Sequence, residues 1–351
     1  MKKSTYQYEL DVLRIMGAIS IVLFHYTFRG YAADNMSILY FPFLGEIFKY
    51  GFLGVFLFFI LSGYTIILSS RNKSFFNFLY SRALRLYPSF WIAVCITSIA
   101  ALLFESDQYH VDLKQFFLNL TMLGDYIGVP PVDGAYWFLF VIINFYFIVS
   151  LIILLNLMRF QKYIAGIWLA LSLVTLFYDG HKIYKFLIMP NFSPFLISGM
   201  IFCATKQEGW DIYKIIIQII SFALSLYIIN NYTHFFKKYY STNTSLYIIF
   251  FIITLIYLLM YILTIKYRNI VLPEYIITLS ASTYPLYLIH QNFGFMIFNH
   301  FGEFVNKYII LSATSVFMIL LSIVIAKYID PLLRNLLIRI IPYNLTKNKS
   351  S

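Results

Sequence analysis

The chain has 351 residues, of which 61% are hydrophobic and only 12% are charged. A soluble globular domain carries about 45–50% apolar and about 25% charged residues, so this composition excludes an ordinary soluble domain. Apolar runs of about 20 residues, the length that crosses a bilayer, recur along the whole chain. The sequence therefore predicts an all-α, polytopic integral membrane protein.

The apolar runs predict about ten transmembrane helices. Between the third and the fourth, "VDLKQFFLNL" places four apolar side chains on one helical face, which predicts a short helix lying at the membrane surface. A lid or structural strap without a catalytic role is the alternative for this segment. In chain order, the ten spans are expected at residues 11–28, 51–70, 88–104, 136–157, 163–178, 190–205, 215–231, 245–265, 275–298 and 308–326.

The basic residues indicate the topology. Lys and Arg outnumber Asp and Glu by 26 to 15, and with the N-terminus inside, this excess falls in the inner segments. Both termini are therefore predicted to be cytoplasmic, and nucleic acid is not an expected partner. One transmembrane domain is expected over residues 1–340, followed by a short polar cytoplasmic tail over 341–351.

Almost every predicted span lacks charge at mid-depth, and Arg14, His25 and His290 are the exceptions. An Arg at bilayer depth costs about 2.5–3.5 kcal/mol on insertion scales, so such residues usually face a cavity and serve function. The spacing of Arg14 and His25 leaves both on one helical face, about 16 Å apart along the axis. His290 lies at a depth similar to that of His25. Two imidazoles are therefore expected near the outer end of one cavity, with a cation at its inner end.

Structural roles are the alternatives for these residues. Arg14 can reach the inner interface and pair with Asp11. Either histidine can be a core residue that hydrogen-bonds a neighbouring hydroxyl or carbonyl group. The remaining histidines lie in predicted loops without further ligands around them, so no metal site is expected.

A second basic feature lies between the second and third spans, in "RNKSFFNFLYSRALRLYPSF". Arg82 and Arg85 are one helical turn apart, so they are expected to point the same way. Two guanidinium groups at the cytoplasmic surface suit phosphate recognition, because each can bind two phosphate oxygens at once. Simple anchoring at the positively charged inner interface is the alternative.

Five stretches together resemble one known family, in the family's own order. The first span has Arg-x10-His spacing, "SRALRLYP" has an Arg-x-x-Arg element, and "SASTYPLYLIHQ" contains Tyr-Leu-x-His. With "GFLGVFLFFILSGYTI" and "AYWFLFVIINFYF", these stretches resemble the membrane-bound acyltransferase family 3, which acetylates bacterial surface glycans. The matching residues are Leu10, Asp11, Leu13, Arg14, Ala18, His25, Gly54, Val55, Phe58, Phe59, Ser62, Gly63, Arg82, Arg85, Pro88, Trp137, Leu139, Tyr146 and His290.

The resemblance implies an O-acetyltransferase of the bacterial cytoplasmic (inner) membrane, which transfers acyl groups other than aminoacyl groups. Its donor would be cytoplasmic acetyl-CoA, used as a substrate, and no permanently bound cofactor is implied. Its acceptor would be a sugar hydroxyl of a cell-surface polysaccharide or lipopolysaccharide O-antigen, free or lipid-linked. Membrane lipids are the remaining expected partners, and the oligomeric state is not indicated.

The resemblance also implies roles for single residues. His25 would act as general base on the sugar hydroxyl, or would carry the acetyl group itself as a relay. Arg14 would guide the pantetheine arm or hold the thioester. Arg82 and Arg85 would bind the phosphates of CoA.

The sugar is expected on the outer side, against Trp137, Asp133 and His290. Trp137 would stack on the sugar ring, although an aromatic anchor at the interface is equally compatible with its position. A polysaccharide or lipid-glycan exporter is the alternative function, and another acyl donor such as succinyl-CoA is the alternative substrate. An exporter predicts internal inverted repeats, which the sequence does not show.

The sequence departs from the family pattern in two places. Phe138 and Asn144 occupy the neighbourhood where many members have Ser-Leu and a downstream Glu. Asp330 precedes Pro331 where a Glu-Lys-Pro element is common. The carboxylate partner of His25 is therefore not identified from the sequence.

Overall fold

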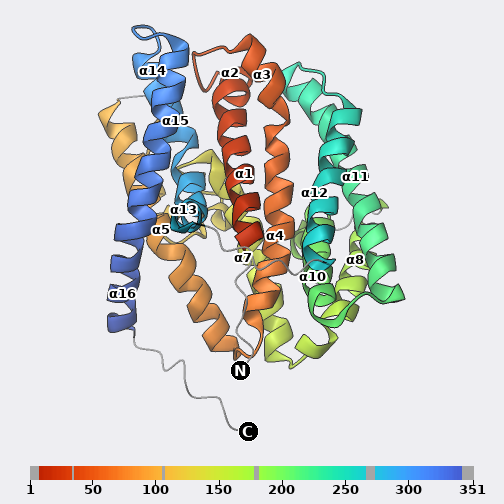
Figure 1. The fold of residues 1–351 in the computed structure, drawn as a ribbon. Helices are drawn as coiled ribbons and strands as arrows, with labels where there is room; N and C mark the ends of the chain where they lie inside the picture. The colour runs from red at the N-terminus through yellow and green to blue at the C-terminus, as the bar shows by residue number, and fades with distance from the viewer. Residues whose placement is uncertain (1–7, 34, 105–106, 178–181, 266–272, 342–351) are drawn as a thin grey trace. The chain divides into compact units, whose positions relative to one another are not determined.

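The computed structural model describes residues 8–33, 35–104, 107–177, 182–265 and 273–341. Over these ranges the regular secondary structure is helical throughout, joined by short 3-10 and π-helical turns. The helices are α1 (Tyr8–Phe24), α2 (Gly30–Ala32), α3 (Pro42–Phe48), α4 (Gly54–Ser70), α5 (Phe75–Leu103), α6 (Leu113–Asn119), α7 (Trp137–Leu154), α8 (Gln161–Phe177), α9 (Lys182–Ile188), α10 (Ser193–Glu208), α11 (Ile212–Tyr240), α12 (Leu246–Ile265), α13 (Glu274–Ile289), α14 (Gln291–Phe301), α15 (Lys307–Val324) and α16 (Asp330–Ile340) (Figure 1).

The predicted fold class is confirmed, because the described helices are those of a polytopic membrane protein. Within the described ranges, eight helical segments are long and apolar enough to cross a bilayer. The two other predicted spans correspond to shorter helices. The fifth is α8, with 17 residues, and the ninth is divided at His290 into α13 and α14. The number of spans and the side of the termini stay predictions, and residues 342–351 of the predicted tail lie outside the described residues.

The short helix predicted in the third interhelical loop is confirmed as α6. Asp112 caps its N-terminus by accepting a hydrogen bond from the backbone N–H of Gln115 at 2.6 Å. Leu113 and Phe117 leave 77% and 62% of their surfaces exposed. An exposed apolar face of this kind is compatible with the predicted position at the membrane surface.

The chain forms two compact units. The first consists of Met1–Leu13, Phe52–Phe75 and Asn144–Val271. Its centre is the contact between α4 and α10, where Gly63 and Gly199 let the two backbones meet. A Cβ atom on either glycine would overlap a backbone carbonyl of the other helix. Small residues at such crossings let membrane helices pack closely.

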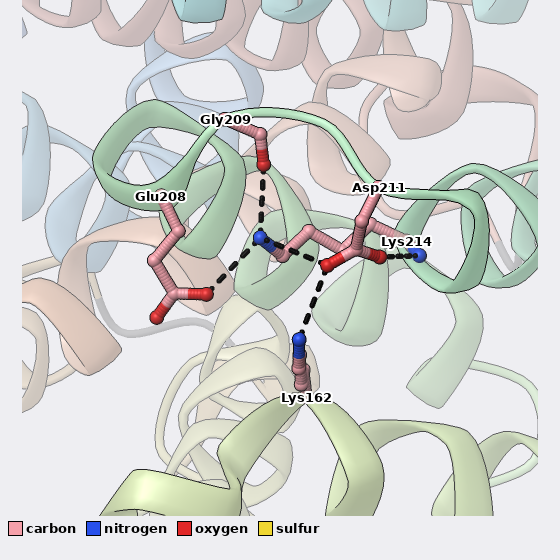
Figure 2. A network of polar contacts seen from close by, with 5 residues as sticks. All are labelled: Lys162, Glu208, Gly209, Asp211 and Lys214. Atoms are coloured by element: carbon pink, nitrogen blue, oxygen red, sulfur yellow. Dashed lines mark hydrogen bonds and ion pairs between the residues drawn. The ribbon is translucent and has the colours of Figure 1, made fainter.

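A buried lysine fixes the turn between α10 and α11 in this unit (Figure 2). The Lys214 ammonium group lies 3.0 Å from Glu208 and 3.4 Å from Asp211, and it donates to the Gly209 carbonyl at 2.8 Å. Asp211 also caps α11 and accepts from Lys162 of α8 at 3.1 Å. Because the Lys214 side chain is only 2% exposed, these partners offset the cost of burying its charge.

The second unit consists of Arg14–Gly51, Phe76–Ile143 and Leu272–Ser351. Within it α13 packs against α15, and the two lie side by side in Figure 1. Helix α5 contains Pro88, whose missing N–H leaves the Leu84 carbonyl without its helical partner. Arg334 of α16 donates to that carbonyl at 3.2 Å. Asp330 of α16 accepts a hydrogen bond from Ser89 at 2.6 Å, so α16 is held against the interrupted turn of α5.

The first prediction concerns pH. A hydrogen bond from the Lys214 backbone N–H, aided by Lys162 and the Lys214 ammonium group, lowers the pKa of Asp211 from 3.8 to about 2. A carboxyl group whose folded-state pKa is depressed stabilises the fold above its unfolded pKa, and this contribution is lost as the pH falls through the folded value. In Asp211→Asn the cap remains but the charge is lost. We expect a lower melting temperature than wild type at pH 6 and only a small remaining difference near pH 2, measured by tryptophan fluorescence in detergent.

The control is Asp112→Asn, because Asp112 caps α6 but makes no ion pair with any described residue. Its melting temperature should follow wild type at each pH. An Asp211→Asn protein that also follows wild type from pH 6 to pH 2 would contradict the assignment.

Candidate active site

His25 begins a π-helical turn in the second unit. The regular helix α1 ends at Phe24, and residues His25–Arg29 form a wider turn, closed by a hydrogen bond from the Gly30 N–H to the His25 carbonyl. The sequence predicted an uninterrupted helix here. Single π-helical turns within α-helices occur frequently at functional sites, because the extra residue redirects the side chains around it. His25 is 8% exposed.

The structure brings His25 and His290 together. The Nε2 atom of His290 lies 3.1 Å from the Nδ1 atom of His25, and the ring centroids are 4.9 Å apart. His290 stands at the junction of α13 and α14 and is fully buried. Two imidazolium ions at this separation would repel each other by roughly 3 kcal/mol at an effective dielectric constant of about 20. The pair is therefore suited to hold at most one extra proton.

Small residues let the two elements meet around this pair. Tyr26 donates a hydrogen bond from its hydroxyl to the His290 carbonyl at 2.7 Å. A Cβ atom on Gly294 would overlap the Tyr26 ring, and one on Gly30 would overlap the Phe295 ring. The aromatic rings thus lie directly on glycine backbone, and the π-helical turn is fixed against α14.

Asp133 holds a third segment against the same junction. Its carboxylate oxygens accept hydrogen bonds from the backbone N–H groups of Ala135 and Asn292, each at 2.8 Å. The Asn292 side chain donates in return to the Val132 carbonyl at 3.0 Å. Burial raises the pKa of the Asp133 carboxyl to about 7, although these hydrogen bonds and the charge of Arg29 act to lower it. Both carboxylate oxygens thus already accept backbone hydrogen bonds, and the expected contact of Asp133 with substrate stays a prediction.

Arg29 is a candidate functional residue that the sequence reasoning passed over. Arg29 is half-buried, and it lies close enough to His25 and Asp133 for its positive charge to interact electrostatically with both side chains. Its guanidinium group makes no hydrogen bond or ion pair with any residue that the structure describes. A fixed positive charge near a base suits the negative charge that develops in acyl transfer. In the sequence, Arg29 could have been found from its position four residues after His25, at the end of the same span.

The other predicted cations lie on α1 and α5. Arg14 is half-buried on α1, eleven residues before His25 and about 16 Å away along the helix axis. Arg82 and Arg85 lie on α5 and differ in burial, although their spacing predicted a common direction. Arg82 is 9% exposed, with its guanidinium carbon 5.6 Å from the Phe78 ring centroid, whereas Arg85 is exposed. Positions three apart diverge by about 60° around a helix, enough to place one side chain in the packed face and the other outside it.

A pocket of about 80 Å³ lies beside the start of α7. The residues that line it include Asp125 and four aromatic residues, Phe90, Tyr136, Trp137 and Phe140. Trp137 is 41% exposed, so part of its ring is available to a ligand. Because one water needs about 10–15 Å³ of such volume, the pocket has room for about five waters, or for part of a sugar ring.

The segment that forms this pocket also contacts the α13–α14 junction. Tyr136 and Trp137 line the pocket, while the Phe138 ring centroid lies 5.5 Å from that of Tyr287, one turn before His290.

Among the described residues, no group of three His, Cys, Asp or Glu side chains lies close enough to hold a metal ion.

Comparison with known proteins gives one informative result. A family model described as an acyltransferase domain, that of acyltransferase family 3, matches residues 7–327, nearly the whole chain. Comparison with curated proteins and with solved structures gave no significant match. The matched range includes the π-helical turn, the paired histidines, the α5 arginines and the pocket.

Proposed function

The chain belongs to acyltransferase family 3, and on that premise we propose that it is an O-acetyltransferase acting on a cell-surface glycan. The membrane acyltransferase activity follows from the family match, which covers residues 7–327. The finer proposal is that acetyl-CoA from the cytoplasm supplies the acetyl group and that a sugar hydroxyl receives it. The acceptor would be a surface polysaccharide or lipopolysaccharide O-antigen, and the membrane the bacterial inner membrane.

One observation carries the proposal. The Nδ1 atom of His25 lies 2.9 Å from the Ile21 carbonyl oxygen and 3.1 Å from the Nε2 atom of His290, and these contacts hold the ring in place. The other ring nitrogen of His25, Nε2, makes no hydrogen bond with any residue that the structure describes. A general base needs this combination, with one ring nitrogen fixed and the other open to the proton that it removes. The intramembrane position gives the arrangement a functional rather than a packing interpretation.

The proposed reaction is direct transfer. Nε2 of His25 takes the proton of the sugar hydroxyl while the oxygen attacks the thioester carbonyl of acetyl-CoA. The tetrahedral intermediate then collapses, the C–S bond breaks, and the thiolate leaves with the proton returned from His25. Arg29 would stabilise the oxyanion, and Arg14 would hold the donor on its way from the cytoplasmic side. A relay in which His25 carries the acetyl group uses the same open nitrogen.

The test of the function compares surface glycans by mass spectrometry in strains with the wild-type gene, without it, and with His25→Ala. Loss of a general base lowers rates by about 10²–10⁴-fold, so we expect acetylation to disappear in both mutant strains. His110→Ala is the matched control, because His110 is exposed and lies in a loop. A glycan acetylated normally in the His25→Ala strain, at equal protein level, would exclude His25 as the base. A succinyl group on the wild-type glycan that is absent from the mutant strains would instead support succinyl-CoA as the donor. A glycan missing from the surface of the mutant strains would support the exporter.

CoA binding should distinguish the two α5 arginines. The exposed guanidinium of Arg85 is free to bind a phosphate, and one charge-assisted hydrogen bond is worth about 1.5–3 kcal/mol. We expect Arg85→Ala to weaken CoA binding about tenfold or more, measured by isothermal titration in nanodiscs, without a change in melting temperature. Arg82→Ala should lower both affinity and melting temperature, because Arg82 is buried beside Phe78.

Arg159→Ala removes the same charge from another predicted inner loop, where Arg159 is exposed, and serves as the control. If all three variants bound CoA equally well, the α5 arginines would serve only as interfacial anchors.

The aromatic pocket is the proposed binding site for the sugar that receives the acetyl group. Aromatic faces suit the C–H groups of a sugar, and the side chain of Asp125, which is among the lining residues, suits its O–H groups. We expect Trp137→Ala to raise KM for the glycan about tenfold with little change in kcat, and Trp137→Phe to recover most of the loss. These constants would be measured as CoA release with purified surface polysaccharide. Phe117→Ala is the control, since Phe117 is 62% exposed on α6 and does not line the pocket. Equal effects at the two positions would indicate interfacial anchoring for Trp137.

A further inference from the structure

The hydrogen bonds around His290 determine where its proton lies. Its Nδ1 atom faces two backbone carbonyl oxygens, those of Tyr287 at 2.8 Å and Leu286 at 3.1 Å. A carbonyl oxygen can only accept, so Nδ1 must carry a hydrogen atom. In a neutral imidazole the other nitrogen, Nε2, then has a lone pair and accepts. That atom is the one that faces His25.

The same reasoning applies to His25. Its Nδ1 atom lies 2.9 Å from the Ile21 carbonyl oxygen and 3.1 Å from Nε2 of His290. Both neighbours are acceptors, so Nδ1 of His25 must carry the hydrogen atom. The lone pair of His25 is thereby assigned to Nε2, the nitrogen that no described residue binds.

We propose that His290 is a positioning residue that holds His25 in the Nδ1-protonated tautomer and directs its basic Nε2 atom toward the acceptor hydroxyl. The proposal rests on the proposed function, in which His25 is the base. His290 acts through His25, because it is fully buried and both of its ring nitrogens are already engaged. This role differs from the direct contact with substrate that the sequence led us to expect for His290.

His290 also acts while the proton moves. When the sugar hydroxyl transfers its proton to Nε2, His25 becomes an imidazolium ion, and its Nδ1–H still points to the lone pair of His290. The hydrogen bond between the rings becomes charge-assisted and therefore stronger, which stabilises the protonated base. The charge leaves when the Nε2 proton passes to the departing thiolate. His290 makes and breaks no covalent bond in this sequence. It occupies the place that a carboxylate takes beside the histidine in Ser-His-Asp triads.

The decisive pair of variants is His290→Leu and His290→Gln. Leucine removes the acceptor, whereas the amide oxygen of glutamine can take the place of Nε2 as an acceptor without titrating. With acetyl-CoA and purified surface polysaccharide in nanodiscs, we expect kcat to fall about 10²-fold or more in His290→Leu, with both KM values unchanged. We expect His290→Gln to recover at least a tenth of wild-type kcat. Wild-type kcat in His290→Leu, or equal loss in the two variants, would overturn the positioning role.

A spectroscopic measurement tests the tautomer without activity. Solid-state NMR of protein with 15N-labelled histidine, in lipid bilayers, separates protonated from unprotonated ring nitrogens, and the His25 signals are identified by their loss in His25→Ala. We expect protonated Nδ1 and bare Nε2 at His25 in wild type and in His290→Gln. A hydrogen atom on Nε2 of His25 in wild-type protein would overturn the inference, even if His290→Leu failed to fold. Because no substrate is needed, this result stands whatever acyl group the enzyme transfers.

Discussion

The hydrogen bond between two buried imidazoles is the constraint around which the second unit is arranged. A histidine that serves as a base in an apolar environment must have one nitrogen satisfied, since an unpaired buried polar group is costly. It must also have the other nitrogen open, or it could not receive a proton. His25 meets both conditions because His290 accepts from Nδ1 at 3.1 Å. The backbone carbonyls that fix the His290 proton extend the chain of hydrogen bonds back into the helix itself.

The surrounding elements maintain that geometry from three parts of the chain. The π-helical turn presents His25, the α13–α14 junction presents His290, and Asp133 joins the segment before α7 to the backbone of Asn292. Glycine at position 294 allows the Tyr26 ring to lie on the backbone beside the pair. Each of these contacts restricts movement of one imidazole relative to the other. Rotation of a base by tens of degrees would cost much of its catalytic effect, so rigidity here has a functional value.

Sequence periodicity predicted the helical spans because lipid imposes a minimum length on each apolar run. It also led to the two histidines, since ionisable groups are conspicuous in such runs and their depth follows from the rise per residue. Periodicity could not reveal the π-helical turn at His25, because one extra residue in a turn leaves no mark in an apolar pattern. The different burial of Arg82 and Arg85 depends on which side of α5 is packed, and the partial burial of Arg29 depends on what packs against the π-helical turn. Those properties arise from contacts between residues far apart in the chain.

The two units show how a structural buried ionisable group differs from a functional one. Lys214 is nearly inaccessible, and its ammonium group is surrounded by Glu208, Asp211 and the Gly209 carbonyl, which use its donors. Such a group stabilises a turn and offers nothing to a ligand. His25 is also buried, but its Nε2 atom is bonded by no described residue, although the rest of the ring is held firmly. Leaving a polar atom unsatisfied costs free energy of folding, and a fold maintains that cost where a ligand completes the hydrogen bond. The unfilled hydrogen-bonding position at Nε2 of His25, rather than burial or charge alone, therefore marks the position of the chemistry.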